Sequence, residues 1–362
     1  MILPTEVNLP LSLFKLKEGV KFSKFYFRKM GINVLLLKNA RSILYHLIIQ
    51  KTDIDDEILI PAYTCESVLS AALRSGRKIR LYDINPESLE ADIGSISNNI
   101  SDRTKIIILQ HLFAVPLIKN DIFKNLPNDI IVIEDSSQLF NLSNPHERID
   151  YTIFSFDVGK PIPLGYGGGL ISHKLNKLIF LNSKKIDFHF LIKIIAKRIA
   201  SNNLIFPAID KFFLKRYTPQ EINLEMDYSN RLLNNFYDKL LFNYYRFLFD
   251  EINRSRIANS IYYDENINHN KFSIKYSLPL LRFPLKSNLD SVPLPLYNLG
   301  VRKMYWNLSK YSQQYDQIIN SKLLPGAEFL EKHLVTLPTH TKVDDKSKQI
   351  IINRLFEYNI IN

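Results

Sequence analysis

The 362-residue sequence predicts an α/β fold, whose large domain has three layers: a mostly parallel sheet with helices on both faces. Short runs rich in Ile, Leu and Val recur between residues 57 and 156. These runs are apolar almost without interruption, which is typical of strands buried on both faces. Helical patterns separate the first of them, as parallel strands require. A smaller α/β domain is expected to follow at the C-terminal end.

The expected elements follow one another in a regular order. A short apolar run, Val34–Leu37, precedes a helical pattern at Ile43–Gln50. The strands are predicted at Glu57–Pro61, Lys78–Tyr82, Lys105–Gln110, Asp129–Ile133 and Tyr151–Phe156. Helices are predicted between the first pairs of strands, at Glu66–Arg74 and Ser88–Asn98.

The pattern changes in the last third of the chain. A long helix is predicted from Asn234 to Phe249, continuing through Tyr263. Two short strands, Leu280–Pro284 and Leu334–Pro338, and a final amphipathic helix, Asp344–Tyr358, then form the smaller unit. The predicted division is an N-terminal arm at 1–35, a large domain at 36–250 and a small domain at 251–362.

Composition restricts the class of protein. Hydrophobic residues make up 46% of the chain and charged residues 23%, which fits an ordinary globular protein. The formal net charge of +11 favours anionic partners, although no run of Lys and Arg suggests nucleic acid. The single cysteine, Cys65, excludes an internal disulfide and suits a reducing compartment. No secretory signal is visible at the N-terminus, so a cytoplasmic protein is expected.

The stretch around Lys160 is the most unusual in the sequence. Lys160 follows a buried strand and a glycine, Gly159, and precedes Pro161. Four of the 11 glycines lie in residues 165–169, which indicates a tight turn or a close approach to a ligand. A buried lysine is costly unless it is paired or used, so Lys160 is either a functional group or a surface residue beside a turn.

Polar residues follow several of the predicted strands at their carboxyl ends, where ligands bind in open α/β sheets. They are Tyr63-Thr64-Cys65, Gln110-His111, Glu134-Asp135-Ser136-Ser137-Gln138 and Ser155 through Lys160. Asp135 is the most notable, because a carboxylate after a strand buried on both faces needs a partner. It is a candidate general base, counterion of a cationic ring nitrogen, or cap of the next turn. No cluster of His, Asp or Glu at ligand spacing lies near it, so no metal is expected.

Two further segments carry an open choice. Ala40-Arg41-Ser42 begins a helix, where free N–H groups and a guanidinium form an anion site, or the segment is a plain helix cap. Residues 186–216 are basic and apolar. They are too interrupted to span a bilayer, and are expected to contact a membrane surface or to pack on the sheet or a second subunit.

Taken together, the motifs resemble the DegT/DnrJ/EryC1/StrS sugar aminotransferases, which are pyridoxal-phosphate (PLP) enzymes of fold type I. The resemblance runs from about residue 36 to 172. It is carried by Arg41-Ser42, Pro61-Ala62-Tyr63-Thr64, His111-Leu112-Phe113, Glu134 to Gln138, Ser155-Phe156, Lys160-Pro161 and Gly165-Tyr166-Gly167-Gly168.

The resemblance implies a role for each matching residue. Lys160 is similar to the lysine that binds the cofactor covalently, and Asp135 to the carboxylate that pairs with the pyridine nitrogen. Gln138 matches the residue beside the ring hydroxyl. Ser155 and Arg41-Ser42 match the phosphate-binding residues. The implied reaction converts a nucleotide-linked keto sugar to an amino sugar, with glutamate or a similar amino donor, in a homodimer.

The sequence also departs from the family pattern. The usual Gly-Thr pair at the phosphate helix is Ala40-Arg41, and an arginine there would supply a charged, bidentate contact. The stacking aromatic residue falls on Cys65, which leaves Tyr63, or no residue, for that contact. Asp157 replaces a histidine. Substrate contacts are expected from the basic residues Lys184, Lys185, Arg231 and Arg282 and from His340.

Two other functions remain open. One is a catalytically retired family member that acts as a binding or scaffold protein. The other is a PLP enzyme for a keto substrate that is not a sugar. The presence of Lys160, Asp135 and Gln138 together favours the aminotransferase, since a retired site need not keep all three. Retention of the lysine also argues against the dehydratase branch of the family, in which a histidine replaces it.

Overall fold

The computed structural model of the chain describes residues 20–116, 120–124, 126–141, 145–172, 178–181, 222, 224–225, 228–319 and 323–361. Most of the predicted N-terminal arm lies outside these ranges, as do the stretch 186–216 and the two lysines at 184 and 185.

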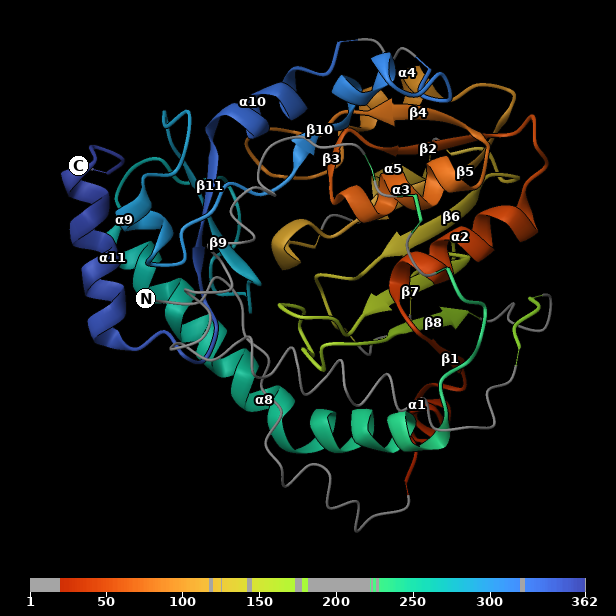
Figure 1. Cartoon of the computed structure of the whole chain (residues 1–362), viewed down its shortest axis with the longest axis horizontal. Helices are drawn as coiled ribbons and strands as arrows, with labels where there is room; N and C mark the ends of the chain where they lie inside the picture. Colours follow the sequence, from red (N-terminus) through yellow and green to blue (C-terminus); the bar gives the residue numbers. More distant parts are fainter. Residues whose placement is uncertain are drawn as a thin grey trace.

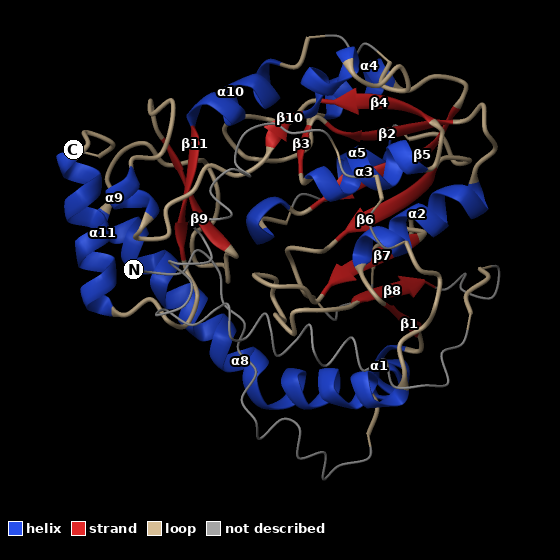
Figure 2. Cartoon of the chain, in the orientation of Figure 1, coloured by secondary structure: helices blue, strands red, loops and turns tan. Residues whose placement is uncertain are grey.

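A seven-stranded sheet forms the centre of the molecule (Figures 1 and 2). Its order is β1 (Asn33–Leu37), β8 (Gly168–Ser172), β7 (Tyr151–Ser155), β6 (Ile131–Asp135), β5 (Thr104–Gln110), β2 (Glu57–Pro61) and β4 (Lys78–Tyr82). The five strands from β7 to β4 are parallel, whereas β8 and β1 pair antiparallel at one side. The predicted α/β fold with a mostly parallel sheet is therefore confirmed.

The strands form where the sequence is richest in β-branched and other apolar side chains. Every residue of β2 and β7 is buried, and so are the four central residues of β5 from Ile106 to Leu109. Burying one such side chain contributes about 1.5–3 kcal/mol. One boundary differs from the prediction in a way that matters. The strand was predicted to end at Ile133, but β6 ends at Asp135, so this carboxylate belongs to the strand as its last residue.

Helices cover both faces of the sheet. On one face lie α2 (Ala40–Lys51) and α3 (Glu66–Arg74), and on the other lie α1 (Phe22–Met30) and the first half of α8 (Asn235–Asn266). The side chains of β7 point alternately to the two faces of the sheet and show this division. Ile153 packs in the core on the α2 side, and Phe154 packs in the core on the α8 side. The sheet is thus the middle layer of three.

The N-terminal region is more regular than its sequence suggested. Instead of an arm without periodicity up to residue 34, the structure has helix α1 and strand β1. Phe22 and Tyr26 of α1 are fully buried among aromatic residues of α8. Gly31 ends the helix with φ of +70°, a conformation that glycine adopts without strain. Tertiary packing therefore forms this helix, which local sequence signals did not reveal.

The helix predicted at Ser88–Asn98 begins later than expected. α4 spans Ile93–Asn99, and the Asp92 side chain caps it by accepting from the Ser95 amide at 2.7 Å. Residues before Asp92 form a turn in which Ile84 bridges to Ala91. The next helix along the chain, α5, is a single short turn at Asn120–Lys124.

The smaller unit packs beside the sheet, and α8 connects the two (Figure 1). It holds an antiparallel pair, β9 (Arg282–Lys286) with β11 (Leu334–Pro338), and the helices α9 (Leu294–Tyr297), α10 (Pro325–His333) and α11 (Asp345–Glu357). A second small pair joins β10 (Trp306–Asn307) to β3 (Tyr63–Thr64) of the large unit. The predicted domain boundary at residue 250 falls inside α8, which is continuous there, and the division into domains stays a prediction.

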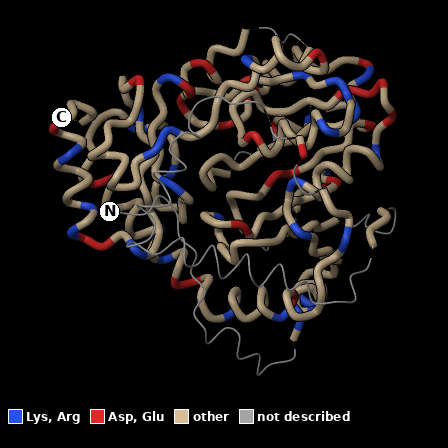
Figure 3. The backbone as a smooth tube through the Cα atoms, in the orientation of Figure 1, with Lys and Arg blue, Asp and Glu red and all other residues tan. Residues whose placement is uncertain are grey.

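Charged residues are distributed over both units. Lys and Arg alternate with Asp and Glu along the described chain rather than forming one block (Figure 3). Among the helices that the structure describes, none is both long enough and apolar enough to cross a bilayer.

Candidate active site

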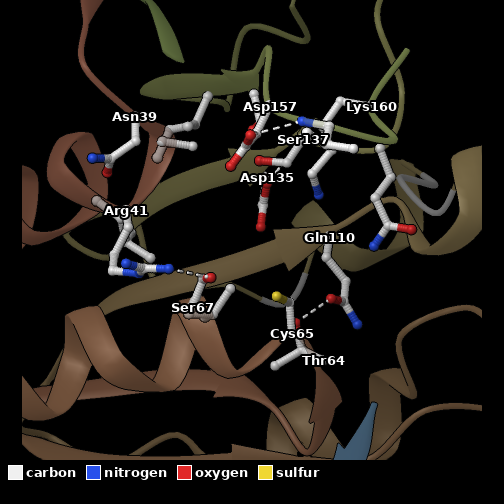
Figure 4. Close-up of a pocket in the computed structure, with 17 residues that line it drawn as sticks. Asn39, Arg41, Thr64, Cys65, Ser67, Gln110, Asp135, Ser137, Asp157 and Lys160 are labelled. Atoms are coloured by element: carbon white, nitrogen blue, oxygen red, sulfur yellow. Dashed lines mark hydrogen bonds between the residues drawn. The ribbon is translucent and has the colours of Figure 1, made fainter. Parts of the chain in front are cut away.

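A cavity of about 260 Å³ lies at the carboxyl ends of β5, β6 and β7, where the sequence predicted a crevice (Figure 4). The start of α2 and the start of α3 form its opposite wall. The predicted site residues that line it are Ala40, Arg41, Cys65, Asp135, Gln138, Ser155 and Lys160.

Lys160 lies on a turn that is fixed at both ends. The Lys160 amide donates to the Asp157 carbonyl at 3.3 Å. The Lys160 carbonyl accepts from the buried guanidinium of Arg256 on α8 at 3.1 Å. Gly159 permits the turn with φ of +70°. Because the backbone is held from two elements, the Lys160 side chain is presented to the cavity from a fixed position.

Asp135 and Gln138 enter the cavity from the segment that follows β6. One carboxylate oxygen of Asp135, Oδ1, accepts from the Ser137 amide at 2.9 Å. The carboxyl side chain points to the middle of the cavity, on the same side as the Lys160 amine (Figure 4). Gln138 is buried, and its Oε1 accepts from the Phe113 amide at 2.9 Å. This contact fixes both the amide of Gln138 and the loop after β5.

The start of α2 has the features of an anion site. Asn39 caps the helix by accepting from the Ser42 amide at 2.7 Å, which leaves the amides of Ala40 and Arg41 at the cavity end of the helix. The Arg41 guanidinium donates to the Ser67 hydroxyl on α3 at 2.9 Å. Backbone amides, a helix dipole and a guanidinium thus meet at one end of the cavity.

Two short side chains from the strand ends complete the cavity. Ser155 is the last residue of β7; it is largely buried and lines the cavity. Asp157 adds a second carboxylate, whose Oδ1 accepts from the Val158 amide at 2.7 Å. The cavity therefore holds two cationic groups, Arg41 and Lys160, and two carboxylates.

Several predicted residues lie outside the cavity. Ser42 is buried behind the start of α2, and the fully buried Tyr63 donates its hydroxyl to the Met304 carbonyl. The Arg282 guanidinium is buried and donates to the Gly300 carbonyl and the Thr336 hydroxyl, each at 2.6 Å. Of the five predicted substrate contacts, the structure describes Arg231, Arg282 and His340; these three are absent from the cavity lining, and Arg231 is exposed.

His111 was predicted to lie in the crevice, but it does not line the cavity. Its Nε2 lies 2.9 Å from Glu134 Oε1, and the other Glu134 oxygen accepts from the Thr152 hydroxyl at 2.7 Å. Because side chains alternate along a strand, Glu134 points to the opposite face of the sheet from Asp135. The pair is consequently structural.

Sequence reasoning missed other residues that shape the cavity. Asn39 was detectable, because an asparagine directly before a helical pattern is a typical cap. Ser67 and Arg256 carried no signal, since their roles depend on tertiary contacts. Gln110 fixes the strand ends by accepting from the Thr64 hydroxyl and donating to the Tyr63 carbonyl.

Comparison with known proteins finds the same family that the sequence motifs resemble. Residues 31–177 match the family described as the DegT/DnrJ/EryC1/StrS aminotransferase family. Over this stretch, about two fifths of the chain, the sequence is similar to that family. The matched residues include the whole cavity lining, from the start of α2 to Lys160.

Individual relatives show how far the similarity extends. A UDP-4-amino-4,6-dideoxy-N-acetyl-beta-L-altrosamine transaminase of Campylobacter jejuni is 23% identical over 365 residues, which is 94% of this chain and 89% of that protein. MJ1066 of Methanocaldococcus jannaschii, an uncharacterised protein, is 27% identical over 42% of this chain and 41% of its own length.

Among solved structures, a putative sugar aminotransferase of Streptococcus pneumoniae, Spr1654 in its PMP form, superposes with a TM-score of 0.69. The superposition covers 98% of this chain and 97% of that one at 15% identity. At this identity the likeness shows the fold, which is that of the PLP-dependent aminotransferases.

Proposed function

We propose that this chain is a PLP-dependent aminotransferase that converts a nucleotide-linked keto sugar to the corresponding amino sugar. The observation that carries the proposal is one cavity that holds Lys160, Asp135 and an anion site at the start of α2. The names of the C. jejuni relative and of the S. pneumoniae neighbour support the same class of reaction.

The residues present fit the cofactor. The anion site, with Arg41 and Ser155, suits its phosphate group. Asp135 supplies the carboxylate that a protonated ring nitrogen requires. The Lys160 amine, which forms no ion pair among the described residues, suits its aldehyde. Gln138 is available at the cavity wall for the ring hydroxyl, although its Oε1 also accepts from Phe113.

When bound, the cofactor supplies a ring that accepts the electron pair left by proton removal. The chain supplies the rest. In the half-reaction with the amino donor, the Lys160 amine would take the proton from the carbon that carries the amino group and pass it to the cofactor. In the half-reaction with the sugar, it would carry a proton from the cofactor to the former keto carbon. Asp135 keeps the ring nitrogen protonated, and the fixed Lys160 turn keeps the amine in place.

The proposed substrate agrees with the charge of the chain. One cofactor phosphate neutralises only part of a net charge of +11, and a nucleotide diphosphate would be attracted by the remainder. Arg231, Arg282 and His340 lie outside the cavity, so their assignment to the substrate stays a prediction from the sequence.

The direct test of the proposed function uses protein loaded with pyridoxamine phosphate. A panel of nucleotide-linked 3-keto and 4-keto sugars is offered, and the products are identified by mass spectrometry. We expect an amino sugar from at least one member of the panel. Efficient reaction with simple 2-keto acids and with no sugar would instead identify an amino-acid transaminase.

The contact between β8 and α2 gives a sharper prediction about the anion site. A Cβ atom on Gly168 would lie 2.6 Å from the Ala40 amide nitrogen, so an alanine there must push the start of α2 away. We expect Gly168→Ala to weaken cofactor binding by roughly tenfold or more, since backbone amides hold the phosphate. The dissociation constant is measured by absorbance titration.

The neighbouring glycine is the matched control. A Cβ on Gly169 would meet the Phe156 ring at 3.3 Å and the Phe154 ring at 3.6 Å, so Gly169→Ala should alter the core and leave the anion site intact. Equal losses of cofactor affinity in the two variants would contradict the assignment of α2 as the phosphate site.

We also propose a homodimer, which the family resemblance implies. Apolar side chains such as Ile179 and Leu181 are exposed on the described chain and would gain from being covered. Light scattering at micromolar concentration should give twice the mass of the chain, and a monomer at that concentration would contradict the proposal.

A further inference from the structure

A segment of the small unit, residues 304–308, is attached to the cavity wall from behind, although none of its own residues lines the cavity in this structure. Its strand β10 pairs antiparallel with β3, so that Trp306 lies opposite Thr64, and the Leu308 amide donates to the Ala62 carbonyl at 2.8 Å. Continuing this register brings Tyr305 opposite Cys65. Residues directly opposite in an antiparallel pair share a face, and Cys65 lines the cavity.

The Tyr305 ring packs against residues that are attached to the cavity wall. It stacks on Phe113 with ring centres 5.9 Å apart and planes at 19°, and it meets the edge of Tyr63 at 6.0 Å. Phe113 is in turn bound through its amide to Gln138, which lines the cavity. The ring is therefore held in one position relative to the site.

The backbone around this aromatic contact is strained. Tyr305, Phe113 and Ala114 all have positive φ, at +66°, +55° and +70°. The left-handed region costs a residue with a side chain about 1–2 kcal/mol. The Leu281 amide helps to hold the loop by donating to the Phe113 carbonyl at 3.0 Å. Residues kept in such conformations cluster where they position a ligand.

The Tyr305 hydroxyl is available to a ligand. Among the described residues it has no hydrogen-bond partner, whereas the hydroxyl of Tyr63 is bonded to Met304. Burial raises the pKa of Tyr305 well above its usual value, and the nearby titratable groups of Cys65, Tyr63 and Asp135 act in the same direction. The hydroxyl thus stays protonated and can donate at any physiological pH.

We propose that Tyr305 recognises the sugar ring of the keto substrate, with its hydroxyl bonded to a sugar hydroxyl. An aromatic ring with a free hydroxyl suits a ligand that has apolar C–H faces and hydroxyl groups. Between the expected place of Tyr305 and the cavity stands only a small side chain, that of Cys65, which lines the cavity. This inference rests on the proposed function, and it assigns the sugar's recognition to a residue of the small unit.

The test compares Tyr305→Phe and Tyr305→Leu with the wild-type protein, each loaded with pyridoxamine phosphate. Calorimetry measures the binding of the nucleotide-linked keto sugars of the panel, and single-turnover absorbance measures the two half-reactions separately. Tyr276→Phe is the control, because it also removes a buried tyrosine hydroxyl, one bonded to the Phe272 amide far from the cavity lining.

Tyr305→Phe should weaken sugar binding by roughly fivefold, the effect of one hydrogen bond, and Tyr305→Leu by considerably more. Cofactor affinity and the half-reaction with glutamate should stay within twofold of wild type, as should every property of Tyr276→Phe. Unchanged sugar binding in both Tyr305 variants would overturn the inference, and so would equal losses in both half-reactions. If the wild-type protein binds no sugar but reacts with 2-keto acids, the proposed function fails first.

Discussion

Replacing Lys160 with alanine is expected to give a folded protein that binds cofactor without a covalent bond and loses nearly all turnover. The amine is both the point of attachment and the proposed base, so at least three powers of ten should be lost, each worth about 1.4 kcal/mol. The fold should persist, because the Arg256 contacts to this turn involve backbone carbonyls only. Circular dichroism and steady-state kinetics measure the two effects.

Lys105→Ala is the control for the loss of a lysine. Lys105 forms an exposed ion pair with Asp129 at 3.3 Å, at the opposite end of β5 from the cavity. Its removal should change turnover by less than twofold. Turnover of Lys160→Ala within tenfold of wild type would show that another group is the base.

Replacing Asp135 with asparagine has the second largest expected effect. The amide has nearly the same shape but no charge, and so it cannot keep a ring nitrogen protonated. We expect cofactor to bind and turnover to fall about a hundred- to a thousandfold, as for other losses of a charge-stabilising group. Absorbance titration measures the binding, and steady-state kinetics measure the turnover.

Asp157→Asn separates this specific role from a general loss of negative charge. Asp157 also lines the cavity, and its described hydrogen bond, to the Val158 amide, is available to an asparagine oxygen. Asp157→Asn should therefore lower turnover much less than Asp135→Asn does. Equal effects of the two variants, or activity of Asp135→Asn within a fewfold of wild type, would assign Asp135 a structural role.

The parts of the site that could be predicted from sequence are those fixed by the sheet. Asp135 and Ser155 end strands whose apolar runs are unmistakable, and Lys160 follows one of them after a tight turn. Parallel strands bring their carboxyl ends to one edge, so these residues had to meet. The buried Tyr63 was misplaced because the two-residue strand β3 has no periodicity to show which way its side chains point.

The parts that could not be predicted depend on contacts between distant segments. Helix α1 begins without a side-chain cap and has no acidic residue in its first turn, and its burial against α8 shows only in three dimensions. Tyr305 comes beside Cys65 through a strand pair of two residues that joins segments 240 positions apart. Arg282 and His340 looked like cleft residues, yet both are buried within the small unit.

The central claim is that Lys160 holds the cofactor, and one measurement tests it most directly. Purified protein is incubated with pyridoxal phosphate, reduced with borohydride, digested and analysed by mass spectrometry. We expect one modified lysine, Lys160, together with loss of the yellow colour on reduction. Modification of a different lysine, or none at all under conditions where the protein is folded, would contradict it.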